Sequence, residues 1–488
     1  MKRIKKGKLT CLRYWFLGIF LLSLATSSVL FFSSAIFGEE DQVLRQAPRN
    51  PEFLRYLEDQ RLGKWWINYS EHGHPLGLIP LPFEIYYLED QFTETIDNLP
   101  ASYDLRNKNK LTAVRNQGGC GSCWAFATYG SLESWLLPSE TWDFAEQHLI
   151  ENHQFKSKPC KGGNIFMSSA YHARWSGPYK ESDYPYEYAY AAKNVQKYVQ
   201  NIYWIPPRKN SSDNTKIKKA VKEYGAVYVS MYWSDTCYNS DYKSYYNKNI
   251  EKGGHAVAIV GWDNNFSKHK FNSTPAGNGA FIVRNSWGTG FGDKGYFYVS
   301  YYDSYFGRDS FSGVFTAEPT TNYTNIYQYD PLGMVNCLGY TSSPKNTAWF
   351  ANIFKANKNN PLRAVSFYAL GTSNNYTIYI YTNVKSNQPR SGTLATTQKG
   401  KFKSPGYFTV PLKNKVNLKT KQKFSVVVKL TTKNWEAPIP IEERDPDYSP
   451  KAKAKAGQSF FSHFGATWVD AIYGWKAKTN VCLKAFAK

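Results

Sequence analysis

The clearest hydrophobic pattern in the chain runs from Trp124 to Leu137. Large apolar residues recur there at helical spacing, and Pro138 ends the run. This spacing predicts a helix, and proline is a common stop signal. Small residues precede the run: Gly118, Gly119, Gly121 and Ser122. We therefore expect the helix to begin at Cys123, with its thiol at the positive end of the helix dipole.

Two short apolar runs further along the chain predict β-strands that carry polar residues. His255 lies in Gly-Gly-His-Ala-Val-Ala-Ile-Val-Gly-Trp, 132 residues after Cys123. Asn285 follows Phe-Ile-Val-Arg and precedes Ser-Trp-Gly. A single histidine in an apolar strand usually packs in a core. A chemical role for His255 is therefore indicated only by its occurrence together with Cys123 and Asn285.

The last third of the chain has a β pattern. Aromatic and β-branched runs alternate there with Asn, Gly, Pro and Lys turns, which predicts a sandwich or jelly-roll of about 160 residues. The runs are Leu362–Leu370, Tyr376–Thr382, Tyr407–Leu412 and Phe424–Leu430.

The N-terminus has the pattern of an export signal. Basic residues through Arg13 precede Tyr14–Gly38, an uncharged stretch of 25 residues. A basic start followed by an apolar stretch is typical of such signals, and this one is long enough to span a bilayer. A cleaved signal peptide and a retained signal-anchor over residues 1–38 both remain open. In either case we expect an extracytoplasmic protein, secreted or anchored to the membrane by this segment.

The decamer Gln-Gly-Gly-Cys-Gly-Ser-Cys-Trp-Ala-Phe at 117–126 carries the candidate chemistry. A thiol attacks carbonyl carbon well only as a thiolate, which a helix N-terminus and a neighbouring imidazolium both favour. Cys120 and Cys123 could instead form a redox site or half of a metal site. A redox site would leave Gln117, His255 and Asn285 without a role, and the sequence has no second Cys-x-x-Cys pair to complete a zinc site.

These motifs, in this order, resemble the papain-type cysteine protease family from about Leu99 to Phe315. The resemblance implies an α+β, two-lobed papain-like domain over residues 99–318, without cofactor or metal. It implies that Cys123 is the nucleophile and that His255 holds the thiolate and protonates the leaving amine. Asn285 would orient the imidazole ring, and Gln117 would donate to the oxyanion with the backbone N–H of Cys123. Trp287 would cover the Asn–His contact.

The same resemblance implies binding positions for an extended peptide. Gly162 and Gly163 would offer backbone hydrogen bonds. Ile165, Ser230 and Ala256 would line a roomy pocket for an apolar or aromatic residue, the second before the scissile bond; ordinary core packing is the alternative for each. Cys120 and Cys160 stand where the family has a disulfide. A further bridge between Cys337 and Cys482 would tie the ends of the last region together.

Residues 39–98 carry no catalytic motif. A turn and a short amphipathic helix are predicted after Ala47, and Gly77–Phe83 reads as extended. In the papain-type family a pro-segment often precedes the mature start, which Leu99-Pro-Ala-Ser-Tyr-Asp resembles. The segment is therefore either a pro-segment or an N-terminal extension that packs permanently on the protease domain. Gly254 and Phe291 depart from the common family pattern and indicate a divergent, microbial-type branch.

The excess charge is concentrated in the last region. The 488-residue chain has a net charge of +22, and residues 323–488 hold 24 Lys and Arg against 7 Asp and Glu. Behind a papain-type domain, this region resembles the lectin-like domain of some microbial relatives. A basic β-domain could bind an anionic cell-wall polymer, a glycan or a membrane surface, and we expect no nucleic acid. Four tryptophans could stack on sugars or belong to the core: Trp349, Trp435, Trp468 and Trp475.

The sequence thus predicts an exported cysteine endopeptidase acting on protein or peptide substrates and localised by a basic β domain. One rival is a non-catalytic adhesin or binding protein with a protease scaffold. Another is a papain-fold amidase or transglutaminase.

Overall fold

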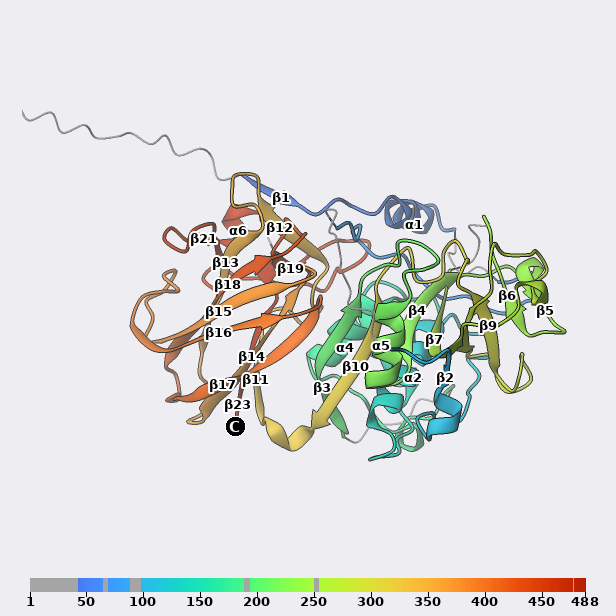
Figure 1. Ribbon diagram of the computed structural model, residues 1–488. Coiled ribbons are helices and arrows are strands. Elements are labelled where there is room, and N and C mark those ends of the chain that lie inside the picture. Colours follow the sequence, from blue (N-terminus) through green and yellow to red (C-terminus); the bar gives the residue numbers. More distant parts are fainter. Residues whose placement is uncertain (1–42, 65–68, 88–97, 188–193, 250–253, 477) are drawn as a thin grey trace, which may run out of the picture. The chain divides into compact units, whose positions relative to one another are not determined.

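The structure is a computed structural model that describes residues 43–64, 69–87, 98–187, 194–249, 254–476 and 478–488 (Figure 1). The predicted signal or anchor at residues 1–38 lies outside these ranges. Among the described residues, no helix is long and apolar enough to cross a membrane.

The helix predicted at Cys123 is present and forms the centre of the protease-like region. It begins at Cys123 and ends at Leu136, directly before the Leu137–Pro138 turn, and all but one of its residues are buried. It packs against strands β4 (Val227–Tyr232), β7 (Gly254–Asp263) and β10 (Ser312–Pro319). The helices are α1 (Pro51–Arg61), α2 (Cys123–Leu136), α3 (Glu146–Asn152), α4 (Ile165–Ala173), α5 (Thr215–Tyr224) and α6 (Ala471–Gly474).

A long sheet joins the protease-like region to the C-terminal region. Within the described residues its order is β11-β23-β14-β17-β3-β10-β4-β7-β8-β9-β6-β5, with β2 paired to β7. Its central-region strands are β2 (Ser102–Asp104), β3 (Lys197–Ile205), β4 (Val227–Tyr232), β5 (Tyr238–Asn239), β6 (Ser244–Tyr245), β7 (Gly254–Asp263), β8 (Ala280–Arg284), β9 (Tyr296–Ser300) and β10 (Ser312–Pro319). Its C-terminal strands are β11 (Asn325–Tyr327), β14 (Pro361–Ala369), β17 (Gly406–Asn417) and β23 (Leu483–Ala487).

Two further sheets among the described residues complete a layered β structure in the C-terminal region. One has the order β16-β15-β18-β13-β20-β21 and the other β1-β12-β19-β22. A shared apolar core fills the space between the sheets, with Phe350, Val426, Phe367 and Ile439 among its members. The strands are β1 (Leu44–Gln46), β12 (Asn336–Tyr340), β13 (Thr347–Lys355), β15 (Asn374–Thr382), β16 (Thr393–Phe402), β18 (Lys423–Thr432), β19 (Ile439–Glu443), β20 (Ser459–Ser462), β21 (Val469–Asp470) and β22 (Thr479–Val481).

The four strand runs predicted here correspond to β14, β15, β17 and β18, which confirms the β pattern. All four pair antiparallel with a neighbour, and their apolar faces turn toward the shared core. The predicted β-sandwich class therefore agrees with the structure.

Contacts between the central and C-terminal regions extend beyond the shared sheet. Strand β3 pairs with β10 on one side and with β17 on the other. Trp175 stacks on Tyr198 from the central region and on Phe486 from the C-terminal region, with ring centroids 3.9 and 5.3 Å apart. Arg174 donates a hydrogen bond of 3.0 Å to the carbonyl oxygen of Pro331. The two regions are thus joined by backbone pairing, aromatic stacking and hydrogen bonding.

The N-terminal segment, defined here as described residues 43–87, touches both regions. Its strand β1 pairs antiparallel with β12, and its helix α1 matches the predicted short helix. Arg49 forms an ion pair with Asp445, and the hydroxyl of Tyr232 donates to the Glu52 carboxylate at 2.5 Å. This segment is therefore packed on the molecule along its described length.

The suggested bridge between Cys337 and Cys482 is wrong, because both thiols are free and buried. Cys337 pairs with Pro440 in β19, and the N–H of Cys482 bonds to the carbonyl oxygen of Pro440 from the other side. One strand therefore separates the two cysteines. Strands lie about 4.8 Å apart, so their Cα atoms are about 10 Å apart, too far for a disulfide.

Candidate active site

Cys123 occupies the first position of α2 and is completely buried. Its Sγ accepts a hydrogen bond of 3.4 Å from the backbone N–H of Ala256. Ala256 follows His255 in β7, so the predicted helix and the predicted histidine strand meet at the sulfur. The small residues before α2 allow the loop of Cys160 to come close: a Cβ on Gly121 would lie 2.8 Å from the carbonyl oxygen of Cys160.

His255 and Asn285 form the expected pair. Nε2 of His255 lies 2.8 Å from Oδ1 of Asn285, which directly follows β8. Because that oxygen is an acceptor, Nε2 carries the proton in the neutral ring and Nδ1 keeps its lone pair. Nδ1 has no hydrogen-bond partner among the described residues. The indole of Trp287 stacks on the imidazole, with centroids 4.8 Å apart, and so covers the pair as predicted.

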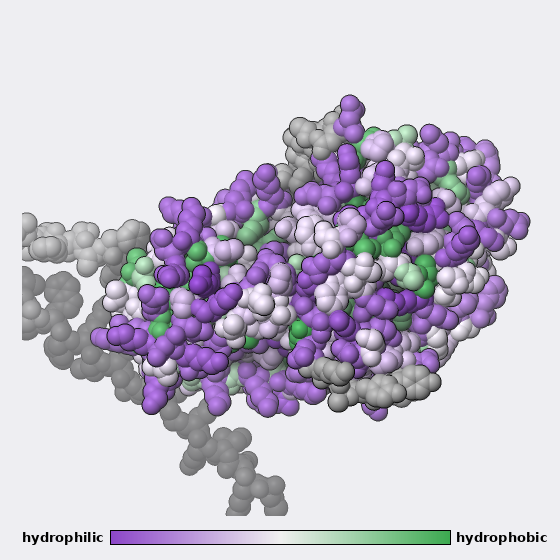
Figure 2. Space-filling model, turned by 90° about the horizontal axis from the view of Figure 1, so that it is seen from below, coloured by the Kyte–Doolittle hydropathy of each residue, from purple (hydrophilic) through white to green (hydrophobic). Residues whose placement is uncertain are grey.

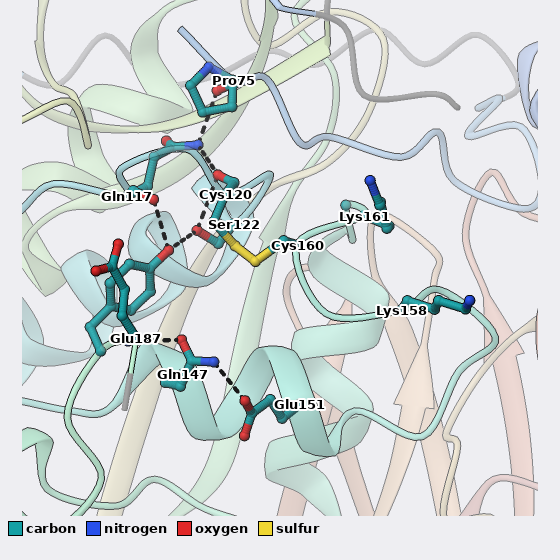
Figure 3. Close-up of a disulfide and its surroundings, with 12 residues drawn as sticks. Pro75, Gln117, Cys120, Ser122, Gln147, Glu151, Lys158, Cys160, Lys161 and Glu187 are labelled. Atoms are coloured by element: carbon teal, nitrogen blue, oxygen red, sulfur yellow. Dashed lines mark hydrogen bonds between the residues drawn. A yellow bond between two sulfur atoms is a disulfide. The ribbon is translucent and has the colours of Figure 1, made fainter. Parts of the chain in front are cut away.

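Gln117 is buried, and all of its side-chain polar atoms are engaged (Figure 3). Its Nε2 donates to the carbonyl oxygen of Cys120 at 2.8 Å and to that of Pro75 at 3.0 Å. Its Oε1 accepts a hydrogen bond of 2.6 Å from Ser286 Oγ. Ser286 therefore fixes the amide so that its N–H groups point toward α2 and the N-terminal segment. The carbonyl oxygen of Pro75 therefore accepts a hydrogen bond from Gln117 Nε2, the group that we predicted to donate to the substrate oxyanion.

A disulfide links Cys120 to Cys160, in agreement with the family resemblance. It joins the loop before α2 to the loop before α4 (Figure 3). The N–H of Gly121 also bonds to the carbonyl oxygen of Cys160 at 3.2 Å. The loop that carries Gln117 is thereby tied to the loop that carries Gly162.

Backbone of the N-terminal segment lies against Gly162 and Gly163. The N–H of Gly163 donates to Gly77 O, and the N–H of Ile79 donates to Gly163 O, both at 2.9 Å. A Cβ on Gly163 would clash with the Trp124 ring at 2.3 Å, and one on Gly162 would lie 3.0 Å from Gly77 O. The glycine pair thus pairs with an extended segment of the same molecule, and its binding of a peptide substrate stays a prediction.

The other three predicted binding residues lie near this contact. Ile165 lines a cavity of about 30 Å³ together with Leu78 and Ile79. Ser230 faces Ala256 in the β4–β7 register. The Ser230 hydroxyl donates to the carboxylate of Asp309 at 2.7 Å, and Asp309 lines the same cavity.

Sequence reasoning missed Asp309. It is 79 residues from Ser230 in the chain, and no motif marks it. A carboxylate beside a pocket predicted to be apolar changes the expected binding preference, although burial raises its pKa to about 6.

Sequence reasoning also missed how far the N-terminal segment enters the cleft. His74 stacks on Trp287, with centroids 4.3 Å apart. The N–H of Leu78 donates to Gly254 O at 3.1 Å. A Cβ on Gly77 would lie 2.2 Å from the carbonyl oxygen of Gly121, so the segment packs directly on the loop before α2. The only signal in the sequence for this position was the extended pattern of Gly77–Phe83.

The covered site favours neutral forms of the reactive pair. Burial raises the pKa of the Cys123 thiol to about 11, although N–H groups of Ala256 and Gly77 donate toward the sulfur and oppose the shift. Burial lowers the pKa of His255 to about 4, against the effect of the Asn285 hydrogen bond. Both shifts disfavour charge in a site closed to water. The thiolate–imidazolium pair remains a prediction for the uncovered cleft.

Two protein families match the two regions. Residues 99–310 match the papain family cysteine protease profile, and residues 326–487 match the lectin-like domain profile. The first match contains all four predicted catalytic positions, and the second contains β12 to β23 together with most of β11.

Curated relatives match the protease part. Peptidase 1 of Euroglyphus maynei is 34% identical over 268 residues, which cover 53% of this chain and 78% of that protein. The viral cathepsin of Choristoneura fumiferana nuclear polyhedrosis virus is 35% identical, over 42% of this chain and 60% of its own. A cysteine protease of Blomia tropicalis is 28% identical, over 43% of this chain and 64% of its own length. The chain thus spans about three fifths of these last two relatives.

Solved structures match both parts together. The cysteine protease and lectin-like domains of Cwp84, described as a surface layer associated protein of Clostridium difficile, are 25% identical to this chain. The match has a TM-score of 0.75 and covers 92% of this chain and 98% of that one. A clostridial Cwp84 structure described as "after propeptide cleavage" matches with a TM-score of 0.68 and covers 79% of this chain and 99% of that one. The chain belongs to the papain family of cysteine proteases and carries a lectin-like domain behind its protease domain.

Proposed function

We propose that the protein is an exported cysteine endopeptidase in which Cys123 is the nucleophile. The observation that carries this proposal is the meeting of Cys123, the His255–Asn285 pair and the Gln117 amide at the N-terminus of α2. Family membership supports the same chemistry. A binding protein that kept only the scaffold would need none of these groups to be intact.

The reaction follows from the positions of these groups. The Cys123 sulfur attacks the substrate carbonyl carbon, and its proton passes to Nδ1 of His255, which carries a free lone pair in the structure. The negative oxygen that forms receives hydrogen bonds from Gln117 Nε2 and the Cys123 N–H. The imidazolium then protonates the leaving amine as the C–N bond breaks. Water, deprotonated by the same ring, cleaves the thioester and restores the thiol.

We further propose that the N-terminal segment is an inhibitory pro-segment. Its Pro75 carbonyl takes a hydrogen bond from the oxyanion donor, and its backbone bonds to Gly163 and Gly254. A peptide substrate needs the same donors and acceptors, so it cannot bind while the segment is in place. Cleavage between Tyr87 and Asn98 would separate the segment from the protease domain.

The lectin-like domain is proposed to hold the enzyme at an anionic or glycan-rich surface outside the cytoplasm. Residues 331–435 contain 16 Lys and Arg and not one Asp or Glu. Hydrophilic side chains dominate the face in Figure 2, where hydrophobic residues form only small separate patches. A cationic, hydrophilic surface suits a polyanion better than an apolar partner. The surface-layer association described for Cwp84 points the same way.

The test is labelling with an epoxide inhibitor selective for papain-type thiolates, followed by peptide mass mapping and a peptide hydrolysis assay. After removal of the segment, we expect an adduct on Cys123 that is lost in His255→Ala, and hydrolysis that is lost in Cys123→Ala. A folded, trimmed protein with no adduct and no hydrolysis would favour the binding-protein alternative. Amine incorporation instead of hydrolysis would indicate a transglutaminase.

A further inference from the structure

A cavity of about 540 Å³ lies beside the six-stranded sheet of the lectin-like domain, between the loop after β15 and the loop after β20. Its lining combines aromatic rings with amide, hydroxyl and guanidinium groups: Tyr381, Asn387, Gln388, Arg390, Ser391 and Trp468. We propose that this cavity binds a sugar ring that carries a negative charge, as a carboxylate or a phosphate. The inference rests on the surface-binding role proposed for this domain and assigns it a site and a ligand class.

An aromatic platform lies on the face of the sheet that turns away from the domain core. Its members Tyr381 and Trp468 line the cavity, and its member Trp349 is buried. Trp349 and Tyr379 stack there with centroids 5.4 Å apart. Trp349, Tyr381 and the partly buried Trp468 belong to one cluster on this face, separate from the core of the domain. Flat aromatic faces pack against the C–H face of a sugar ring, while amides and hydroxyls bond to its hydroxyl groups. A cavity with both kinds of group suits a sugar better than an apolar ligand.

Arg390 is fixed at the edge of this platform. Its guanidinium carbon lies 5.1 Å from the centre of the Trp349 ring and 5.7 Å from that of Tyr379. Its Nη1 donates to the carbonyl oxygen of Gly465 at 2.6 Å, and its Nε donates to the Tyr381 hydroxyl at 3.2 Å. Among the described residues, no carboxylate pairs with Arg390 and Nη2 has no partner. A cation held in this way and left without an anion is suited to bind one from a ligand.

The surroundings of Arg390 favour an anion over a neutral group. Lys429 also lies over the Trp349 ring, at 5.6 Å. The nearest acidic residue along the chain from the second loop is Asp470, and its oxygens accept hydrogen bonds from the N–H groups of Gly457 and Ile472. Arg390 and Lys429 thus place two positive charges over the Trp349 ring, which favours a carboxylate or phosphate on the sugar.

The experiment uses the full-length protein with Cys123→Ala, which prevents self-cleavage. Tryptophan fluorescence is titrated with three probes that share one ring: glucuronic acid, glucose 6-phosphate and glucose. The galactose counterparts form a second set. The site variants are Arg390→Gln and Trp468→Ala. Arg363→Gln is the matched control, because it removes the same charge from an exposed position on β14, in a different sheet.

We expect at least one acidic sugar to bind, with glucose and galactose at least about tenfold weaker, since a charged hydrogen bond is worth about one such factor. Arg390→Gln should weaken binding of the acidic sugar by the same factor, and Trp468→Ala should also weaken it. Arg363→Gln should change the affinity by less than about twofold. Comparison of the affinities for the uronic acids and for the sugar phosphates identifies which anion is preferred.

The proposal is overturned if no acidic sugar binds, if the neutral sugars bind as tightly, or if Arg363→Gln and Arg390→Gln weaken binding equally. The last result would assign binding to overall charge. Peptide hydrolysis by otherwise wild-type trimmed protein, with or without Arg390→Gln, reports on the protease proposal separately. A failure at the cavity is thereby distinguished from a failure at Cys123.

Discussion

The amide of Gln117 and the carbonyl oxygen of Pro75 lie 3.0 Å apart, joined by a hydrogen bond across 42 residues of chain. The substrate oxyanion needs this amide, and the N-terminal segment satisfies it with an uncharged backbone oxygen. The contact uses no side chain of the segment. Inhibition by the segment should therefore depend on backbone shape in the cleft, which can be altered at a single position.

Gly77→Ala should release the cleft. The new Cβ would lie 2.2 Å from the carbonyl oxygen of Gly121, which cannot move freely because Gly121 is tied to Cys160. Overpacking of this kind costs about 1–3 kcal/mol. We expect the intact chain to react with the epoxide at least about fivefold faster at Cys123. Gly290→Ala is the control, because its Cβ meets nothing within 4 Å and its φ is not positive. Equal labelling rates in wild type and Gly77→Ala would contradict an inhibitory contact.

Gln117→Ala should have opposite effects before and after removal of the segment. In the trimmed enzyme, kcat should fall by about 10²–10³ with little change in KM, because an oxyanion donor is lost. In the intact chain, the segment loses its hydrogen bond from Gln117, so Cys123 should label faster. The matched control is Gln147→Ala on α3, whose amide bonds to Glu151 outside the cleft (Figure 3). A similar loss of kcat in both variants would argue against the oxyanion role.

Acid should loosen the N-terminal segment. Burial against Trp287 lowers the pKa of His74 below its ordinary value of 6.5, with His72 adding to the shift and Asp235 opposing it. The released segment therefore binds more protons than the docked one. Docking should weaken as the pH falls through 6.5 and continue to weaken until the docked histidine itself is protonated.

Asp235 acts in the same direction at lower pH. Although burial opposes the shift, hydrogen bonds from Trp233, Ser70 and the His72 N–H lower the pKa of its carboxyl, and protonation would weaken those bonds. The measurement is the Cys123 labelling rate of the intact chain from pH 7.5 to 5, divided by that of His74→Phe at each pH. Phenylalanine can stack on Trp287 without titrating. A ratio that stays flat, or falls with acid, would contradict the prediction.

Loss of the Cys120–Cys160 disulfide should reduce both stability and activity. The bridge spans 40 residues, and closure of such a loop destabilises the unfolded chain by about 4 kcal/mol. It also ties the Gln117 loop to Gly162, so kcat/KM should fall as well. The measurement is denaturant unfolding of Cys120→Ser/Cys160→Ser. Reductant should bring the wild type to the same midpoint and leave the double variant unchanged.

Asp309 should broaden the choice of residue two positions before the scissile bond. Its carboxylate lines the cavity beside Ile165 and accepts from Ser230, so the pocket can receive Lys or Arg as well as apolar side chains. In trimmed enzyme, Asp309→Asn should reduce kcat/KM for a peptide with Arg at this position by about tenfold, the value of one charged hydrogen bond. A matched peptide with Leu should be cleaved at the wild-type rate. Equal effects on both peptides would point to a structural role.

Local patterns explain why the reactive groups could be predicted. The start of α2 is set by glycines before Cys123 and an apolar run after it, and the strands of His255 and Asn285 are short apolar runs with clear ends. The β-strands of the lectin-like domain were predictable for the same reason. Pairing partners were not: β3 and β17 are about 200 residues apart, and neither sequence shows that they share a sheet.

The segment in the cleft was hidden for a different reason. Its main contacts use backbone groups of Pro75, Gly77 and Leu78, which every sequence possesses. The Cys337–Cys482 suggestion failed because spacing along the chain does not show that Pro440 stands between the two thiols.

Strand β1 has a consequence for the lectin-like domain. It is the outermost strand of its sheet, and Leu44–Gln46 satisfies backbone groups of Leu338–Tyr340 in β12. Departure of the segment would leave a row of unpaired N–H and C=O groups along β12, a ready template for another extended chain. A single maturation cut would then create two vacancies in one molecule: a groove that accepts a peptide for cleavage and a sheet edge that can accept one for attachment.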